Sequence, residues 1–328
     1  MTKQEIIDLL KKDMMDEHQA IIQYLFHAYA MEEGEIPCEI EAVAREEMRH
    51  LDWLAEAIVE LGGDPTMERT PPDLTLADVE TLMRKDVDLE QGAIDTYRAQ
   101  IEMIDDPKIR RLLARILSDE VAHKGTFADL ADEGREMEEA GQEGMNEALL
   151  GDGGEDGEPV SDRLAGILNQ GIRHEYTVIL QYLYHSFVAE GKEVAEELED
   201  AAINEMQHMG WLSEALAERG GHPHMERFKL FLSRDPEKNI EADIAAEQAV
   251  TRDYTAHLAE IDDDELHALL GRIREHEIYH DAVFQDLLHE VREEQQAEEE
   301  QGSQEEEPPA RPSRPIPSVG SLLGEGQD

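Results

Sequence analysis

The sequence predicts an all-α protein that consists of two tandem four-helix bundles and a disordered, acidic and Pro-rich C-terminal tail. First, 40% of its 328 residues are hydrophobic and 33% charged, but only 5% are aromatic, which suits amphipathic helices better than sheets. Second, apolar residues recur at steps of three and four along extended stretches. Third, the chain contains an internal repeat, and its length is enough for two ordinary domains.

The repeat covers most of each predicted bundle. Residues 17–69 align without a gap on residues 175–227 at an offset of 158, and 25 of these 53 positions are identical. The segments QYLFH and QYLYH match, as do EMRHLDWLAEA and EMQHMGWLSEA. After a shift of one residue, 90–123 also aligns on 247–280. Self-similarity of this kind indicates two copies of one domain.

Composition marks the boundaries between the copies and the tail. Residues 151–159 read GDGGEDGEP, which is typical of a flexible linker, and we place that linker at 141–160. The copies then occupy residues 1–140 and 161–292. Residues 293–328 are rich in Glu and Gln and then in Pro, so we expect them to be disordered.

Each copy is expected to contain four helices. Glycine and proline mark the breaks at Gly34, at residues 62–65 and at residues 105–107. The connection that begins at Gly62 and ends at Thr75 is the longest, so two helical hairpins are joined by a long crossover, as in one class of four-helix bundle. The helices predicted for the first copy span residues 3–32, 36–61, 76–103 and 107–137.

Charge and cysteine content exclude several classes of protein. The formal net charge of −50 repels nucleic acid and anionic membranes and attracts cations, although the acidity of a halophilic host would explain it equally well. The lone cysteine, Cys38, rules out disulfide frameworks and Cys-rich metal sites. No apolar run approaches the roughly 20 residues of a membrane span. The N-terminus lacks the apolar region of a signal peptide, so we expect a cytoplasmic protein.

A Glu-x-x-His motif occurs twice in each copy. Residues at i and i+3 lie on one face of a helix about one turn apart, so both side chains can bind the same metal centre. One such motif in so acidic a chain would be weak evidence, but each copy has one in its second and one in its fourth predicted helix. The four pairs are Glu47 with His50, Glu120 with His123, Glu205 with His208, and Glu277 with His280.

The first and third helices each supply one further glutamate, and the spacing of these residues provides a geometric test. In every hairpin the first Glu precedes the second by 30 residues. Rising along one helix and descending its neighbour by equal amounts returns the chain to the same height, so six ligands of each copy converge at one level. The four spacings are Glu17 to Glu47, Glu90 to Glu120, Glu175 to Glu205, and Glu247 to Glu277.

Four carboxylates and two imidazoles suit two hard or borderline divalent ions. Bridging carboxylates can hold such a pair at the ~4 Å spacing of two-metal sites. Iron is favoured over manganese or zinc because two redox-active ions can share the electrons that reduce dioxygen. The alternative is that the glutamates are solvated and the histidines are ordinary core residues, but several buried carboxylates without a metal would be costly. The sequence therefore predicts two dinuclear iron sites in the chain.

Four tyrosines recur beside the predicted ligands. Each follows a first-helix or third-helix Glu by seven residues, which is two turns along the same face and nearer to a ligand on a neighbouring helix. Each is either a hydrogen-bond partner of a ligand, or a one-electron donor, or a core tyrosine with a satisfied hydroxyl. They are Tyr24, Tyr97, Tyr182 and Tyr254.

These motifs resemble the bacterioferritin branch of the ferritin superfamily. The run from Glu17 to Tyr24, EHQAIIQY, is similar to that family's first-helix motif, and EMRH at Glu47 and DEVAH at Asp119 are similar to its second and fourth. The resemblance implies a ferritin-like bundle in which Glu47 and Glu120 bridge the two metals. Glu17 with His50 would bind one metal, and Glu90 with His123 the other. In the second copy the bridging residues would be Glu205 and Glu277, and the terminal ligands would be Glu175, His208, Glu247 and His280.

By the same resemblance the activity is that of a ferroxidase, which oxidises Fe(II) with O2 or H2O2 for iron storage and detoxification. Rubrerythrins typically add a Glu one turn from the third-helix ligand, where this chain has Ala93 and Val250, and a Cys-rich module that this chain lacks. Two alternatives remain open. One is a rubrerythrin-like peroxide reductase or an enzyme like manganese catalase, and the other is a non-catalytic iron-binding or scaffold protein.

A haem is a further cofactor that the resemblance implies. Met48 and Met206 occupy the position at which bacterioferritin dimers supply two axial ligands to a shared haem, so a tandem chain that folds as its own pseudo-dimer would bind haem between its copies. The alternative is that both methionines only pack. The fusion and the long tail depart from the family, so the usual cage is in doubt and a homo-oligomer of another kind is possible.

The end of the tail carries apolar residues that serve no core, which suggests a docking peptide at about residues 315–326. Its VGSL sequence resembles the peptides that load cargo into encapsulin shells, and about 20 flexible tether residues would reach roughly 25 Å. The partner would then be an encapsulin shell protein that stores the mineral around this chain. The alternative is an uninformative tail. The residues of the proposed peptide are Val319, Gly320, Ser321, Leu322 and Leu323.

Overall fold

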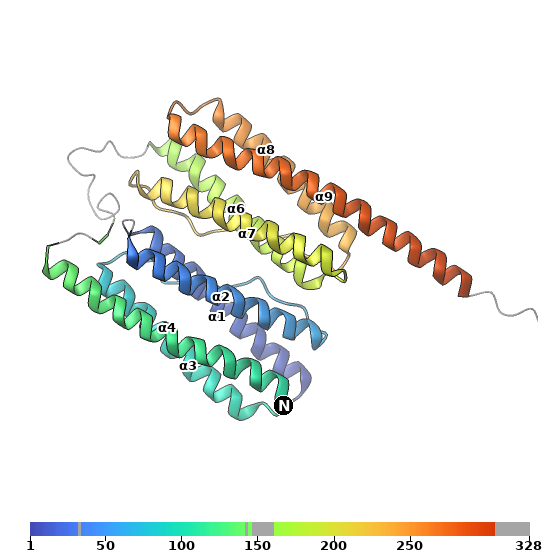
Figure 1. Ribbon diagram of the computed structural model, residues 1–328, viewed down its shortest axis with the longest axis horizontal. Coiled ribbons are helices and arrows are strands. Elements are labelled where there is room, and N and C mark those ends of the chain that lie inside the picture. The colour runs from blue at the N-terminus through green and yellow to red at the C-terminus, as the bar shows by residue number, and fades with distance from the viewer. Residues whose placement is uncertain (32–33, 142–143, 146–160, 306–328) are drawn as a thin grey trace, which may run out of the picture. The chain divides into compact units, whose positions relative to one another are not determined.

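The computed structural model describes residues 1–31, 34–141, 144–145 and 161–305 and consists of helices joined by loops (Figure 1). Within these residues there is no β-strand beyond one isolated bridge between Met31 and Met145. Residues Met1–Leu288 form one unit that holds both copies, and the contacts described below lie within it. None of the described helices combines the length and apolar character that a membrane crossing requires.

The first copy contains four helices, and short polar side chains cap the starts of α1, α3 and α4. Thr2 caps α1 in a reciprocal pair with Glu5, Asp78 caps α3, and Asp106 caps α4 just before Pro107. At the end of α2, Gly62 adopts a φ of 73°, which glycine tolerates best. The helices are α1 (Lys3–Tyr29), α2 (Glu35–Glu60), α3 (Val79–Met103) and α4 (Pro107–Glu139).

The second copy repeats this pattern with different capping residues. Ser161 caps α6, and Asp235 followed by Pro236 begins α8. Gly220, with a φ of 74°, follows α7 as Gly62 follows α2. The helices are α6 (Asp162–Val188), α7 (Lys192–Ala217), α8 (Pro236–Leu258) and α9 (Asp264–Glu305).

The predicted fold class of two tandem four-helix bundles is confirmed. Helix boundaries in the first copy differ from the predicted ones by three residues at most, the largest differences being at the end of α1 and the start of α3. The boundary of the tail differs more, because α9 continues to Glu305 whereas the tail was expected from residue 293. Residues 293–301 contain only Glu, Gln and Ala, which favour helix over coil.

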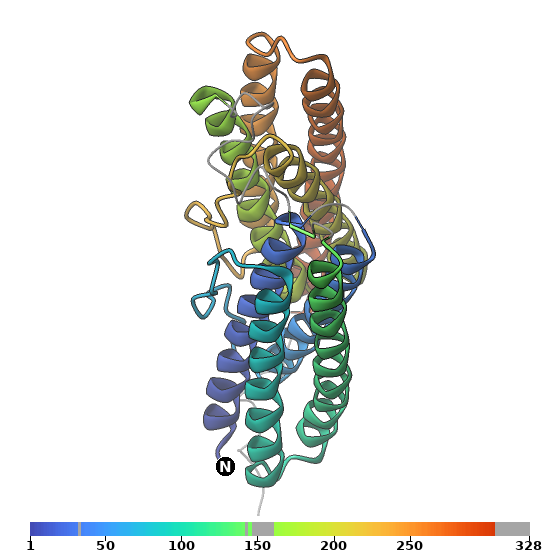
Figure 2. The ribbon, with the colours of Figure 1, turned by 90° about the vertical axis from the view of Figure 1, so that its left-hand side faces the viewer.

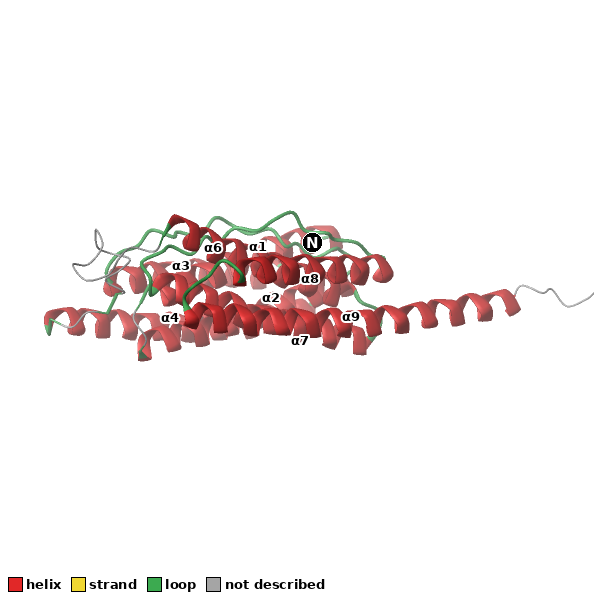
Figure 3. Ribbon diagram, turned by 90° about the horizontal axis from the view of Figure 1, so that it is seen from above, coloured by secondary structure: helices red, strands yellow, loops and turns green. Residues whose placement is uncertain are grey.

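The long crossover of each copy packs along its first helix. In the first copy the Thr70 amide donates to the Met15 carbonyl at 2.9 Å, and the Asp73 amide donates to the Gln23 side chain at 2.9 Å. In the second copy the Phe231 amide donates to Gln181, the residue equivalent to Gln23, at 2.9 Å. Figures 2 and 3 show the two crossovers on the same side of the bundles. Residues of both crossovers also contact the other copy, among them Arg69 and Arg227.

The two copies pack as a pseudo-two-fold pair, with α1 against α7 and α2 against α6. His18 and Tyr176 are equivalent residues and contact each other, with the Tyr176 oxygen 2.7 Å from His18 Nε2. Equivalent arginines reach across in both directions. Arg69 donates to the Tyr176 hydroxyl at 3.1 Å, and Arg227 donates to Glu68 at 2.7 Å. Contact between equivalent residues is what a two-fold interface produces.

Two glycines of α4 differ in their surroundings and provide a stability test. A Cβ at Gly134 would lie 2.6 Å from Val79 Cγ1 and 3.2 Å from the Glu80 amide nitrogen, whereas a Cβ at Gly125 would meet nothing within 4 Å. We expect Gly134→Ala to lower the free energy of unfolding by about 1–3 kcal/mol through overpacking. We expect Gly125→Ala to raise it by up to about 1 kcal/mol through helix propensity. Chemical denaturation of the metal-free protein measures both, and equal effects of the two substitutions would contradict the close α3–α4 approach.

Candidate metal centres

Each copy gathers its six predicted ligands in the bundle core, two from each Glu-x-x-His helix and one from each of the other two. All twelve side chains are buried. Every helix contributes at one level, as the equal 30-residue spacings require. Centre 1 comprises Glu17, Glu47, His50, Glu90, Glu120 and His123. Centre 2 comprises Glu175, Glu205, His208, Glu247, Glu277 and His280.

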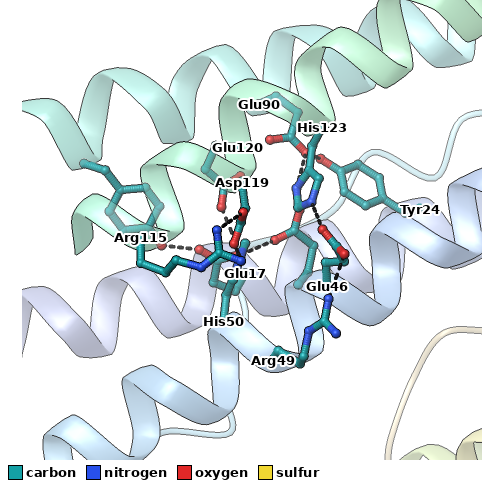
Figure 4. Close-up of polar contacts among 12 residues, drawn as sticks. Glu17, Tyr24, Glu46, Arg49, His50, Glu90, Arg115, Asp119, Glu120 and His123 are labelled. Atoms are coloured by element: carbon teal, nitrogen blue, oxygen red, sulfur yellow. Dashed lines mark hydrogen bonds and ion pairs between the residues drawn. The ribbon is translucent and has the colours of Figure 1, made fainter. Parts of the chain in front are cut away.

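The ligands of centre 1 fall into two overlapping groups. Glu47 lies between the two histidines, with one oxygen 2.7 Å from His50 Nδ1 and the other 2.9 Å from His123 Nδ1. Figure 4 shows these histidines together with Glu17, Glu90 and Glu120. Glu120 also approaches His50 Nδ1, at 3.0 Å. Glu47 and Glu120 belong to both groups, while Glu17 with His50 completes one group and Glu90 with His123 completes the other. The shared pair and the two outer pairs are the residues for which the resemblance implies bridging and terminal roles.

Centre 2 has the same arrangement. Glu205 lies between its histidines, with its two oxygens 2.6 Å from His208 Nδ1 and 2.6 Å from His280 Nδ1. Glu277 lies 3.0 Å from His208 Nδ1. The two groups again share two carboxylates, Glu205 and Glu277, and within each group the ligand atoms all lie within 4.8 Å of one another.

Burial dominates the electrostatics of the shared carboxyls. Loss of solvent raises the pKa of Glu47 to about 7 and that of Glu120 to about 8, and neighbouring carboxylates act in the same direction. Burial and then the Glu120 charge raise the pKa of Glu90 well above its usual value. Burial disfavours the charged form of His123, but contact with Glu47 and other carboxylates raises its pKa to about 9. In the metal-free centre, bound protons therefore reduce the negative charge of the carboxyl cluster. A bound cation would do the same.

The unsatisfied atoms of the centres fit metal binding. Buried polar atoms in folded proteins almost always have a hydrogen-bond partner. Here buried ligand atoms without one occur in both copies, and a pair of divalent cations would satisfy them, because carboxylate and imidazole are ligands of iron. The atoms are Glu90 Oε2 in centre 1 and Glu175 Oε2, Glu247 Oε2 and Glu277 Oε2 in centre 2.

The four recurring tyrosines donate hydrogen bonds to terminal glutamates. Tyr24 donates to Glu90 at 2.5 Å, so the first helix supports the third. In the other three pairs Tyr97 donates to Glu17, Tyr182 to Glu247 and Tyr254 to Glu175. All four side chains are buried, and each hydroxyl orients a terminal ligand of the opposite helix.

A buried aspartate network beside each centre was not predicted from the sequence. Asp86 accepts from Gln23 at 2.9 Å and lies 2.8 Å from His27 Nδ1. In the second copy, Asp243 accepts from Gln181 at 2.8 Å and lies 2.8 Å from His185 Nδ1. Both aspartates precede the third-helix ligand by four residues, on the same helix face. The sequence did contain a signal for this network, because the aspartate, the glutamine and the histidine all recur at equivalent positions of the two copies.

Two further carboxylates missed in the sequence contact the outer nitrogens of the centre 1 histidines. Asp119 lies 3.4 Å from His50 Nε2, and Glu46 lies 2.8 Å from His123 Nε2. Each immediately precedes one of the shared glutamates, Glu120 and Glu47 respectively. Adjacent residues on a helix point in different directions, so the sequence did not indicate that both would reach a histidine.

A cavity of about 250 Å³ adjoins centre 1 between α1 and α3, and its lining includes Glu17, Glu90 and Glu120. Asp13 also lines it. One Asp13 oxygen accepts from Gln100 at 2.7 Å, and the other has no hydrogen-bond partner. Burial raises the Asp13 pKa to about 8. The cavity therefore borders three of the six residues of centre 1.

A larger cavity of about 540 Å³ lies between the copies and is lined by residues of α1, α2, α6 and α7. Met48 and Met206, at equivalent positions of α2 and α7, both line it. Its walls are mainly apolar, and two cations, Arg45 and Arg49, contribute to its lining from the first copy only. The pseudo-two-fold packing therefore encloses a space of the size that holds a small organic ligand.

Comparison with known proteins agrees with this fold. A ferritin-like domain matches residues 7–137 and again residues 165–294. The chain belongs to the ferritin-like family and carries its domain twice. Among its relatives is the bacterioferritin of Desulfovibrio desulfuricans, which is 32% identical over 127 residues, 37% of this chain and 71% of that protein.

Solved structures with similarity to the chain include that bacterioferritin, whose diiron site was studied in different catalytic states. It is 30% identical, with a TM-score of 0.40 over 42% of this chain and 83% of that one. The manganese catalase KatB from Anabaena is 22% identical, with a TM-score of 0.35 over 41% of this chain and 78% of that one. A second structure of the same catalase is 20% identical, with a TM-score of 0.37 over 52% of this chain and 87% of that one.

The raised carboxyl pKa values predict how the stability of the metal-free protein depends on pH. A carboxyl whose pKa is higher in the folded than in the unfolded state stabilises the fold below its unfolded pKa of about 4.3, and this contribution is lost as the pH rises through the folded value. For Glu47, Glu120 and Asp13 those folded values are about 7 to 8. We therefore expect the melting temperature of the metal-free protein to fall between pH 5 and 8, by roughly 3 °C for each kcal/mol lost.

Loading with Zn(II) is the control for this pH dependence. The metal binds the deprotonated ligands and replaces their protons, so the melting temperature of the loaded protein should stay level or rise over the same pH range. Thermal melts followed by circular dichroism measure both forms. A metal-free protein that becomes more stable from pH 5 to 8 would contradict the protonated state of the centres.

Proposed function

We propose that the chain is a ferroxidase that oxidises Fe(II) to Fe(III) at both centres. The observation that carries this proposal is the pair of overlapping four-ligand groups in each copy, which share two carboxylates. Two metal ions that share carboxylates can each give one electron to the same oxidant. The kinship with bacterioferritin supports iron as the substrate metal.

The reaction balances with iron as substrate. Two Fe(II) ions lose one electron each, and O2 takes up two electrons and two protons to give H2O2. With H2O2 as oxidant, the same two electrons and two protons give two water molecules. The raised pKa values of Glu47 and Glu120 mean that these carboxyls hold protons before iron binds, and iron binding displaces them. Tyr24 and Tyr97 hold the terminal ligands Glu90 and Glu17 in place by donating hydrogen bonds.

Access to centre 1 is consistent with this role. The 250 Å³ cavity reaches Glu17, Glu90 and Glu120 from the side of α1 and α3, and Asp13 contributes a carboxyl with one unpartnered oxygen. Carboxylate oxygens attract hard divalent cations. In this proposal Fe(II) approaches centre 1 through the cavity and displaces the proton that Asp13, with a pKa of about 8, holds at neutral pH.

Stopped-flow mixing of anaerobic protein with Fe(II) and O2 tests the activity. We expect oxidation far faster than in buffer, saturating near four irons per chain, two for each centre. A Glu47→Ala/Glu205→Ala variant loses a shared ligand in both copies and should oxidise iron more than about tenfold more slowly. A variant with the exposed α2 residue Glu39 changed to Gln is the control and should match the wild type.

The alternatives give different results in the same experiment. No acceleration over buffer would reject the ferroxidase and favour a non-catalytic iron-binding or scaffold protein. Disproportionation of H2O2 by manganese-loaded protein, without rapid iron oxidation, would favour an activity like that of manganese catalase. Peroxide reduction that requires a separate electron donor would favour a rubrerythrin-like enzyme.

We also propose that haem binds in the cavity between the copies. Met48 and Met206 line that cavity from equivalent positions and would supply two thioether ligands, while Arg45 and Arg49 would pair with the anionic propionates. The mainly apolar walls suit the porphyrin face. A bound haem would supply one-electron transfer between the copies and an external partner.

Haem binding is tested by absorption spectroscopy of protein produced under haem-replete conditions. We expect a Soret band in the wild type and its loss or shift in a Met48→Leu/Met206→Leu variant, in which the volume of each side chain is nearly kept. The variant should retain the helical content of the wild type. Absence of a Soret band from haem-replete wild-type protein would reject the proposal.

We propose further that the chain is cargo of an encapsulin nanocompartment, held by its C-terminal peptide. The supporting observations are the VGSL sequence at residues 319–322, its position near the end of the chain and the Pro-rich segment that precedes it. The peptide lies outside the residues that the structure describes. In this proposal the chain oxidises iron and the surrounding shell stores the mineral.

Deletion of residues 315–328 tests the docking role. Co-expressed with an encapsulin shell protein, the full chain should co-purify with the shells, and the deleted chain should not. Because the deletion removes no residue of either centre, its ferroxidase activity should equal that of the full chain. Co-purification that persists after the deletion would refute the docking role of the peptide.

A further inference from the structure

We infer that the two metal centres are unequal, and that centre 1 binds divalent metal more tightly than centre 2. The proposed cause is a pair of carboxylates that contact the outer nitrogens of the centre 1 histidines and are missing at the equivalent positions of the second copy. The inference rests on metal binding at the centres and not on the oxidation of iron, so the two can fail independently.

All four ligand histidines present the same nitrogen to the carboxylates. In each, Nδ1 faces the core, and the nearest carboxylate oxygen lies between 2.6 and 2.9 Å away. Metal binding at Nδ1 leaves a proton on Nε2, because a neutral imidazole carries one N–H. The group that contacts Nε2 therefore determines how strongly the ring is polarised.

In centre 1 both Nε2 atoms have carboxylate partners, and each partner comes from the opposite helix. Asp119 of α4 lies 3.4 Å from His50 Nε2 of α2, and Glu46 of α2 lies 2.8 Å from His123 Nε2 of α4. Figure 4 labels Asp119 and Glu46 next to His50 and His123. The two pairs form a reciprocal arrangement between the Glu-x-x-His helices.

Neither carboxylate is retained in the second copy. His276 replaces Asp119, and its Nδ1 lies 2.9 Å from His208 Nε2. Asn204 replaces Glu46. Its side-chain nitrogen Nδ2 donates to the Asp200 backbone carbonyl of its own helix at 3.0 Å. The replaced residue is the first letter of each motif in the sequence. The motifs are EEMRH and DEVAH in copy one, and NEMQH and HEIYH in copy two.

An anionic partner and a neutral one have different effects on a metal ligand. A carboxylate that accepts the Nε2 proton raises the basicity of the ring, fixes its orientation and strengthens the metal bond, and loss of such a partner typically lowers metal affinity about 10- to 100-fold. A neutral imidazole accepts the same proton with less electrostatic gain. Centre 1 therefore has two additional negative charges next to its ligands, and centre 2 has none at these positions.

Nearby arginines do not cancel this difference. Arg115 pairs with Asp119 at 2.6 Å and Arg49 with Glu46 at 2.7 Å, but both side chains are more than half exposed, so water screens their charge. In the second copy the residue equivalent to Arg115 is Arg272, which lies 4.1 Å from the ring centroid of Trp211. Gln207 replaces Arg49, so centre 2 lacks one exposed, water-screened arginine in addition to the two carboxylates that contact the histidines directly.

Equilibrium titration with Co(II), in competition with a chelator and followed by visible absorption, tests the inference on the full chain. A Glu205→Ala/Glu277→Ala background leaves centre 1, and a Glu47→Ala/Glu120→Ala background leaves centre 2. We expect each background to bind two Co(II) ions, with centre 1 the tighter by about tenfold or more. In the wild type, Co(II) should fill centre 1 first and centre 2 second.

Exchanging the outer residues separates this effect from structural damage. In the centre 1 background, Glu46→Asn/Asp119→His should lower the Co(II) affinity toward that of centre 2. In the centre 2 background, Asn204→Glu/His276→Asp should raise it by about tenfold, which a merely disruptive change cannot do. A control variant, Glu39→Asn/Asp129→His, removes two exposed acids from the same helices without contact to a histidine and should leave the affinity unchanged.

The outcomes are decisive in both directions. Tighter binding at centre 1, transferred to centre 2 by the exchange, supports the inference. Four equivalent Co(II) ions per chain, an exchange without effect, or an equal loss in the Glu39→Asn/Asp129→His control would overturn it. None of these results depends on iron oxidation, which stopped-flow measures separately.

Discussion

The structure depends on the burial of eight glutamates and four histidines inside two helical bundles. Carboxylates removed from water favour their protonated form, and burial raises the pKa values of Glu47 and Glu120 far above the ordinary range. Without a cation such a cluster is a cost to the fold, since several of its atoms have no hydrogen-bond partner. With two divalent ions the same cluster becomes a set of satisfied ligands. Metal affinity at these clusters would therefore be gained at the expense of metal-free stability.

The surrounding residues make this burial tolerable and aim the ligands. Tyrosine hydroxyls donate to the terminal glutamates from the opposite helix, as in the Tyr24–Glu90 pair. One turn away from Glu90, Asp86 is buried with His27 and Gln23 as its partners. Both networks recur in the second copy. Each terminal glutamate is thus held by a buried tyrosine of the opposite helix.

Duplication within one chain gives a pseudo-dimer whose halves can diverge. Equivalent residues still meet where the copies pack, as His18 and Tyr176 do, and the inner ligands are the same in both centres. A symmetric homodimer must change both of its sites at once, whereas a tandem chain can change one. Asp119 and its equivalent His276 contact corresponding histidines with different charge. The divergence lies next to the ligands and leaves the ligands themselves unchanged.

The sequence by itself determined the helical fold class, the two copies and the level at which the ligands meet. The rise per residue of a helix is constant, so equal spacings of 30 residues place Glu17 and Glu47 at the same level along the bundle axis. The same holds for Glu90 and Glu120. Only the tertiary structure decided which side chains meet across helices, because this depends on how each helix is rotated and how far it lies from its neighbours. Asp86, Glu46 and Asp119 were unremarkable acids in a chain with a net charge of −50 until packing brought each of them to a histidine.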